Sequence, residues 1–135
     1  MKVVVNVDGG ARGNPGPAAV AAVATSPDGE PLGERNAYIG EATNNVAEYR
    51  ALLLGLELAR DLGAGEVVVV NDSELVARQI GGVYKVKHAG LKPLFIEAMR
   101  SLREFDGWSV RAVRREQNER ADELVNEALD EARSA

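Results

Sequence analysis

Residues 3–16 read VVVNVDGGARGNPG: a run of mostly β-branched residues that ends on a carboxylate and is followed at once by glycines. Alternation along residues 3–8 places three valines on one face of a predicted strand and Asp8 on the other. The glycines and the proline that follow are typical of a tight turn. A strand built only for a core rarely ends this way, so Asp8 is the first candidate site residue.

Turn signals and hydrophobic periodicity divide the rest of the chain into alternating elements. Four consecutive valines within residues 66–72 are typical of a strand buried on both faces, as in a parallel sheet. The other predicted strands are 18–25, 32–40 and 108–113, and the predicted helices span about 43–62, 72–80, 93–105 and 118–132. This order predicts a single α/β domain over residues 1–135, in which helices pack on a mixed five-stranded sheet.

Composition narrows the possible chemistry. The chain of 135 residues has a net charge of −5, no cysteine and one histidine, His88, so any metal would be held mainly by oxygen ligands. No apolar run is long enough for a membrane span and no signal-peptide pattern opens the chain, so we expect a cytoplasmic protein without membrane contact.

Four acids occupy special positions in the predicted elements. Asp8 and Asp72 end two strands that would bring them to one edge of the sheet if the strands are parallel neighbours. Glu48, in the first turn of its predicted helix, and Asp122 each begin the apolar stripe of a helix. Converging carboxylates repel one another, and divalent cations would relieve that repulsion, so the pattern favours a two-metal site suited to phosphoryl displacement.

Each acid also has an ordinary structural interpretation. Glu48 is compatible with a helix-dipole charge, Asp72 with an N-cap and Asp8 with a turn residue. Asp122 is compatible with a surface ion pair to Arg120 or Arg115. Only the shared placement of the four acids favours a site over these alternatives.

Five ordered motifs together resemble the type 1 ribonuclease H family. They are Asp8-Gly9-Gly10, Gly13-Asn14-Pro15-Gly16, Thr43-Asn44-Asn45 with Glu48, Asp72-Ser73, and Asn118-Glu119-Arg120-Ala121-Asp122. The resemblance covers residues 3 to about 129, nearly the whole chain. It implies a ribonuclease H fold with strand order 3-2-1-4-5 and helices on both faces of the sheet.

The resemblance also implies an activity: endonucleolytic hydrolysis of the RNA strand of RNA–DNA hybrids, leaving 5′-phosphate and 3′-hydroxyl ends. By the family pattern, two Mg²⁺ ions, with Mn²⁺ as a substitute, are held by the four carboxylates. Asp8 would bridge both ions, Glu48 and Asp72 would join it on the ion near the leaving oxygen, and Asp122 would join it on the ion that activates water.

Substrate contacts follow from the same resemblance. Asparagine both donates and accepts, as a ribose 2′-hydroxyl does, which suits contact with RNA in the minor groove of the hybrid. Gly9 and Gly10 would let the backbone approach the RNA, and Thr43 would help to hold a DNA phosphate. The substrate-binding residues implied are Gly9, Gly10, Asn14, Thr43, Asn44, Asn45 and Ser73, with helix capping as the alternative role of the asparagines.

The chain departs from the family pattern in two places. The loop before the last helix, VRREQN, is short and lacks a histidine, and Arg115 and Glu116 are the nearest candidates to replace it. A basic protrusion is also missing, and only Lys85 and Lys87 remain as candidate contacts, with His88 as a candidate phosphate donor. The alternative interpretation is that Lys85, Lys87 and His88 are ordinary solvent-exposed loop residues.

The leading hypothesis is therefore a metal-dependent hybrid-specific ribonuclease that is monomeric. A broader activity on double-stranded RNA or RNA–DNA junctions stays open, as does a non-catalytic hybrid-binding module. The acidic composition and the missing protrusion predict weak hybrid binding that falls steeply with salt.

Overall fold

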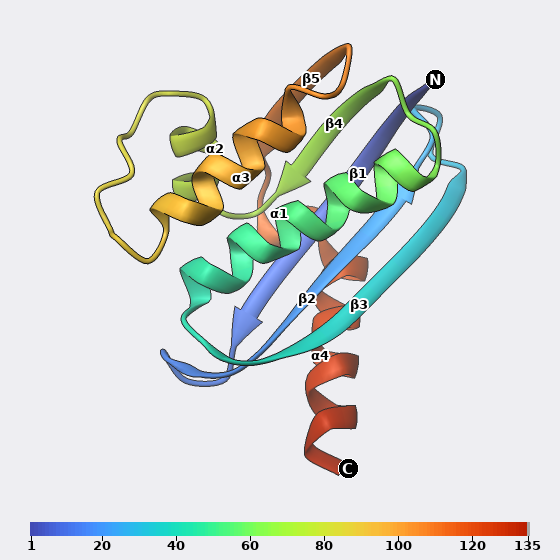
Figure 1. Cartoon of the computed structure of the whole chain (residues 1–135). Helices are drawn as coiled ribbons and strands as arrows, with labels where there is room; N and C mark the ends of the chain where they lie inside the picture. Colours follow the sequence, from blue (N-terminus) through green and yellow to red (C-terminus); the bar gives the residue numbers. More distant parts are fainter. Residues whose placement is uncertain (135) are drawn as a thin grey trace.

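The computed structural model describes residues 1–134, which form one five-stranded sheet flanked by helices (Figure 1). The strands are β1 (Lys2–Ala11), β2 (Gly16–Thr25), β3 (Pro31–Ala42), β4 (Glu66–Asn71) and β5 (Gly107–Ala112). Their spatial order is β3-β2-β1-β4-β5, and this confirms the predicted order.

The central strand β1 pairs in two ways. It runs antiparallel to β2, with Asp8 opposite Ala21, and parallel to β4, where the last recorded pair is Asn6 with Val70. Strand β1 is longer than predicted, because its pairing with β2 continues through the glycines to Ala11. Asp8 therefore lies inside β1, but beyond the point where β4 stops pairing with it.

Helices cover both faces of the sheet, as predicted. They are α1 (Asn44–Asp61), α2 (Glu74–Ile80), α3 (Lys92–Leu102) and α4 (Glu119–Ser134), with a 3₁₀ turn, η1 (Arg115–Gln117), before the last. Figure 1 shows α1, α2 and α3 on one face and α4 on the other. The larger apolar cluster lies under the first three helices, and a smaller one lies between α4 and strand β2.

Strand β2 is built almost entirely from small residues. Val20, Ala22 and Ala24 belong to the cluster under α1, while Ala19 and Ala21 pack against α4. Because these side chains are short, helices can approach the sheet closely from both sides. The strand therefore contributes side chains to both apolar clusters, one on each face of the sheet.

The valine strand β4 is less enclosed than predicted. Val67, Val69 and Val70 are buried, but Val68 is partly exposed. Helix α4 makes its main sheet contacts with β1, β2 and β3, so the face of β4 that carries Val68 is only partly covered. The prediction of burial on both faces is therefore wrong at Val68.

Glycines end two helices where the backbone takes a positive φ. Gly63 follows α1 with φ of 81° and Gly82 follows α2 with φ of 79°, conformations that favour glycine. The predicted third helix is too long at its end, since α3 stops at Leu102, and the last helix begins at Glu119 rather than Asn118.

Candidate active site

A cleft of about 610 Å³ opens where β1 passes the end of β4, and the four predicted acids line it. Asp8 comes from β1, Glu48 from α1 and Asp122 from α4, while Asp72 immediately follows β4. The other lining residues include Gly9 and Gly10 of β1 and residues 113–116 before α4. Side chains from distant parts of the sequence are thus gathered at one edge of the sheet.

The register of β1 and β4 explains why two of these acids meet. Asp8 lies two residues beyond Asn6, and Asp72 lies two residues beyond its partner Val70. Both acids therefore follow the last parallel pair by the same distance along the chain. This is the carboxyl edge at which parallel strands present functional side chains.

Glu48 reaches the cleft from α1 because the helix passes very close to β1. A Cβ placed on Gly9 would overlap the backbone carbonyl oxygen of Ala47, so only glycine permits this approach. Glu48 is the fifth residue of α1, just past the first turn rather than within it as predicted. The interpretation of Glu48 as a first-turn charge favoured by the helix dipole therefore does not hold.

Two further structural interpretations of the acids do not hold. The N-cap of α2 is Ser73, whose side chain accepts from the Val76 amide, and not Asp72. Arg120 pairs instead with glutamates on β3 and α4, at 2.8 Å from Glu34 and 2.9 Å from Glu123. Asp122 has no recorded ion pair within residues 1–134.

Burial and mutual repulsion disturb the ionisation of the site. The pKa of Asp8, whose exposed fraction is 9%, is raised to about 8, first by burial and then by the charges of Asp72, Asp122 and Glu48. Burial also raises the pKa of Glu48, against a hydrogen bond with Ser73 that lowers it. Ionising all four acids would thus place more negative charge in the site than its own surroundings neutralise.

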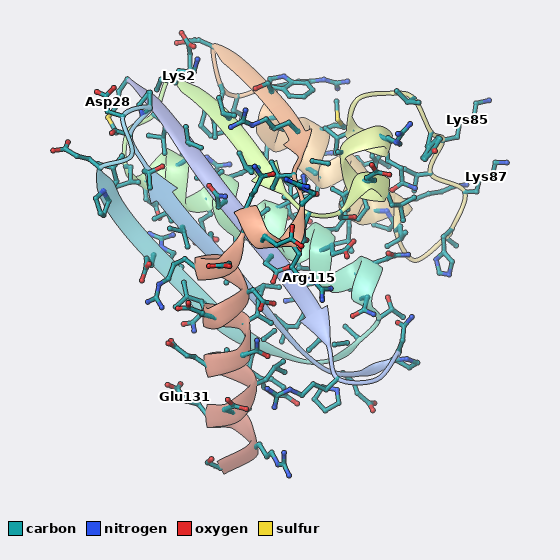
Figure 2. All side chains as sticks on the ribbon, turned by 180° about the vertical axis from the view of Figure 1, so that it is seen from behind. Lys2, Asp28, Lys85, Lys87, Arg115 and Glu131 are labelled. Atoms are coloured by element: carbon teal, nitrogen blue, oxygen red, sulfur yellow. The ribbon has the colours of Figure 1, made fainter. Side chains whose placement is uncertain are left out.

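The cation nearest to this charge comes from the short loop before α4. Arg115 Nε lies 4.0 Å from a carboxylate oxygen of Asp72, and its side chain is 83% exposed. Burial raises the pKa of Asp72, and the charge of Arg115 opposes that rise. Figure 2 shows Arg115 beside the start of α4. Glu116, the other predicted substitute for the loop histidine, also lines the cleft and lies 3.9 Å from Arg114.

The donor set suits a hard divalent cation. All four acids offer oxygen ligands, and their charges when ionised lack compensation, a combination that suits hard divalent cations such as Mg²⁺, Ca²⁺ or Mn²⁺. As arranged, no three acidic or histidine side chains within residues 1–134 are close enough together to enclose an ion.

Two asparagines hold the turn between β1 and β2 against the start of α1. Asn14 Oδ1 accepts from the Asn44 amide at 3.1 Å, and Asn44 Oδ1 accepts from the Ala11 amide at 2.8 Å. Thr43 is the N-cap of α1, and Asn45 is exposed beside it. Of these four residues Asn44 lines the cleft, and the two bonded asparagines have a structural function beside it.

The glycines of β1 differ in their surroundings. Gly9 is buried and serves the close contact with α1, a function that the sequence did not suggest. A Cβ on Gly10 would meet only Val125 Cγ1, at 4.0 Å. Both residues line the cleft, but only Gly10 leaves open space beside its Cα.

Three predicted contact residues lie away from the acids. Lys85, Lys87 and His88 belong to the irregular segment between α2 and α3, and none of them lines the acidic cleft. Figure 2 shows both lysines pointing outward from this segment. His88 Nδ1 accepts a hydrogen bond from the Gly90 amide at 3.1 Å.

Two polar residues beneath the acids were not predicted as site residues. Asn118 is 2% exposed and bonds to β1 directly below Asp8, and Asn6 bonds to Asn118 in turn. A usable signal was the asparagine itself, because this residue is uncommon inside an otherwise apolar strand.

The sheet order and the acidic cleft together define a ribonuclease H-like domain. The profile of the family described as "Reverse transcriptase-like" matches residues 6–128. The structure superposes on the RNase H1 of the halophilic archaeon Halobacterium salinarum with a TM-score of 0.95 and 45% identity, covering 97% of this chain and 99% of that one. The chain belongs to the type 1 ribonuclease H family, which confirms the prediction.

Two further relatives extend this comparison. The structure titled LC11-RNase H1 in complex with RNA/DNA hybrid has a TM-score of 0.92 and 48% identity, with 96% of this chain and 98% of that one covered. A bifunctional protein of Mycobacterium tuberculosis is 47% identical over 98% of this chain. The chain spans only 36% of that protein's length, and 63% of the curated ribonuclease HI of Halobacterium salinarum, which is also 47% identical.

None of the helices within residues 1–134 combines the length and the apolar character needed to cross a lipid bilayer.

Proposed function

We propose that this domain is a metal-dependent endonuclease that hydrolyses the RNA strand of RNA–DNA hybrids and leaves 5′-phosphate and 3′-hydroxyl ends. The observation that carries the proposal is the cleft in which Asp8, Glu48, Asp72 and Asp122 meet with uncompensated charge. A pure binding module has no need to gather negative charge where a phosphate must lie. The binding of an RNA/DNA hybrid by a 48% identical relative supports the same substrate class.

The four acids would hold two Mg²⁺ ions, or Mn²⁺ in their place. Such a pair supplies an activated water and stabilises the charge that develops on the attacked phosphate and the leaving oxygen. Asp8, the most buried of the acids, would be shared between both ions. Glu48 and Asp72 would share the ion near the leaving oxygen, and Asp122 the ion near the water.

The chain itself orients the substrate. Asn44, which lines the cleft, and its neighbours Asn14 and Asn45 would offer their amide groups to ribose 2′-hydroxyls, while Gly10 leaves room for the backbone of the RNA. Thr43 and Ser73 are the N-caps of α1 and α2, and the amino-terminal ends of these helices would favour a nearby phosphate.

Charged residues outside the acid cluster would assist. Arg115 remains cationic at neutral pH, so its contribution near Asp72 would be electrostatic, with Glu116 beside it in the same loop. Lys85, Lys87 and His88 would contact phosphates of a long hybrid beyond the cleft. All four acids come from one chain, which supports action as a monomer. The expected cytoplasmic location stays a prediction.

The test is a cleavage assay on three labelled duplexes: an RNA–DNA hybrid, double-stranded RNA and double-stranded DNA, each with Mg²⁺, Mn²⁺ or EDTA. We expect cleavage of the hybrid's RNA strand with either metal and none with EDTA. Cleavage that persists in EDTA would exclude the metal mechanism, and binding without cleavage would favour a binding module. Cleavage of double-stranded RNA would establish the broader activity.

A pair of matched variants assigns the activity to the cleft. Asp8→Asn should abolish cleavage while the chain still folds, because it removes the shared carboxylate. Asp28→Asn, in the exposed turn between β2 and β3, should leave cleavage unchanged. Activity of Asp8→Asn near that of the wild type would show that the site lies elsewhere.

A further inference from the structure

A pair of amide side chains joins β1 to the beginning of α4 beneath the acidic cleft. Asn118 Nδ2 donates to the backbone carbonyl of Val7 at 2.9 Å, and Asn118 Oδ1 accepts from Asn6 Nδ2 at 3.0 Å. Asn118 is 2% exposed, so both of its polar atoms depend on these partners. We call Asn6 and Asn118 the amide bridge.

The amide bridge touches the chain next to two of the four acids. Val7 immediately precedes Asp8 on β1. On the other side, Asn118 immediately precedes α4, and its carbonyl accepts from the Asp122 amide at 3.2 Å, one helical turn later. The bridge therefore fixes the backbone under Asp8 relative to the turn that carries Asp122.

This part of α4 needs such a constraint. The carboxyl groups of Asp8 and Asp122 approach closely, and once both are ionised their charges oppose that approach. Two other contacts hold α4 on either side of Asp122. Arg120 Nε lies 2.8 Å from Glu34 Oε2, and Asn36 donates to the Leu124 carbonyl at 2.8 Å. Those contacts tie α4 to β3, whereas the amide bridge ties it to the strand that carries Asp8.

We propose that Asn6 is a positioning residue of the metal site: by holding Asn118, it sets the place of Asp122 opposite Asp8. The inference rests on the proposed function, since it assumes that these two acids share a metal. It assigns a purpose to a polar residue that lies inside an apolar strand and does not itself line the cleft. Polar groups behind metal ligands commonly tune affinity by about ten- to a hundredfold.

Two matched variants separate positioning from simple support of the fold. Asn6→Val removes the donor to Asn118 and keeps a strand-forming side chain. Asn36→Val removes a similar asparagine bond between a strand and α4, but that bond ends at Leu124 and bypasses Asn118. If Asn6 served only to dock α4, the two variants would behave alike.

Three measurements compare them with the wild type: calorimetric titration of the metal-free chain with Mn²⁺, steady-state cleavage of a hybrid, and hydrogen exchange of the Asp122 amide. For Asn6→Val we expect Mn²⁺ affinity and kcat each to fall about tenfold, with KM for the hybrid unchanged. We also expect at least about tenfold faster exchange at Asp122, because a loosened turn opens more often. Asn36→Val should change none of these by more than about twofold.

Equal metal affinity, kcat and exchange in the two variants would overturn the proposal. If Asn6→Val does not fold, Asn6→Thr, whose shorter side chain keeps a hydroxyl donor, replaces it. We then expect the same changes in metal affinity, kcat and exchange, each of smaller magnitude. A wild-type chain that neither binds Mn²⁺ nor cleaves hybrid would refute the proposed function and the metal part of this inference. Amide exchange at Asp122 would then decide by itself whether Asn6 positions that residue.

Discussion

At the scale of single residues, Asp8 is the group whose chemistry conflicts most with stability. Burial and three neighbouring acids raise its pKa to about 8, far above the value of 3.8 for a free side chain. Between these values the folded chain binds a proton that the unfolded chain has released. The free energy of unfolding of the metal-free chain therefore falls as pH rises through this range.

A pH series tests this conflict. In EDTA, the midpoint of thermal unfolding should fall between about pH 5 and about pH 8, by an amount that reflects several kcal/mol. Asp8→Asn should flatten this dependence and raise the midpoint near neutral pH, whereas Asp28→Asn should change neither. A midpoint that stays constant over this range would contradict the raised pKa of Asp8.

Gly9 gives a second prediction at this scale. In Gly9→Ala the new methyl group would overlap the Ala47 carbonyl, so α1 must move away from β1. We expect the free energy of unfolding to fall by about 1–3 kcal/mol, and cleavage to fall as Glu48 moves away from Asp8. Chemical denaturation measures the first effect. Gly10→Ala, with space for its methyl group, serves as the stability control, and an equal loss there would refute the explanation.

Single residues also show which parts of the candidate site could be predicted from the sequence. Asp8 and Asp72 could be predicted because each ends an apolar run, and Glu48 and Asp122 because each begins an apolar stripe. Asn6 and Asn118 could not be paired in advance, since their contact joins positions 112 apart in the chain. The contact between Gly9 and Ala47 is likewise set by helix placement, which no local pattern records.

At the scale of elements, α1 and α2 are joined by one buried polar contact. The Tyr49 hydroxyl donates to Gln79 Oε1, and both side chains are buried. Burial also raises the pKa of Tyr49 to about 12. Since Ser73 heads α2 and follows Asp72, this contact helps to hold one wall of the cleft.

Tyr49→Phe should lower the free energy of unfolding by about 1–2 kcal/mol, because it leaves the buried Gln79 amide without its partner. Denaturant titration measures the change, and Tyr38→Phe, at an exposed position on β3, is the control. A loss no larger than that of the control would mean that Gln79 finds another partner.

Elements were predicted well where a local signal exists, and less well at their ends. Gly63 and Gly82 mark the ends of two helices through backbone conformation, so both boundaries were visible in the sequence. The end of β1 was not, because pairing with β2 carries the strand through glycines that ordinarily end one. The exposure of Val68 depends on which strands α4 covers, a matter of tertiary packing.

At the scale of the whole molecule, a net charge of −5 must be reconciled with a polyanionic substrate. Binding would depend on a few cationic contacts outside the acidic cleft, so it should be weak, and each contact adds about one to the slope of its loss with salt. The strand order and the two-sided helical cover were predictable from the order of elements. The outward direction of Lys85 and Lys87 was not, because their segment has no periodic pattern.

The charge argument predicts an effect of removing both lysines together. Lys85→Ala combined with Lys87→Ala should weaken hybrid binding and reduce the slope of log affinity against log salt by up to about 2. Fluorescence anisotropy on an uncleaved hybrid in Ca²⁺ or EDTA measures this slope. Lys2→Ala, at the far end of β1, is the control, and an unchanged slope in the double variant would place both lysines off the binding path.

The alanines of β2 limit the substitutions that this sequence can accept during evolution. None of them lines the acidic cleft, yet Ala21 lies opposite Asp8 and packs on α4, and Ala22 lies in the cluster under α1. A larger side chain at either position would push a helix that carries one of the acids. Substitution there should therefore be tolerated as poorly as at the acids themselves, so a mutational scan of activity would identify β2 as a second region of intolerance.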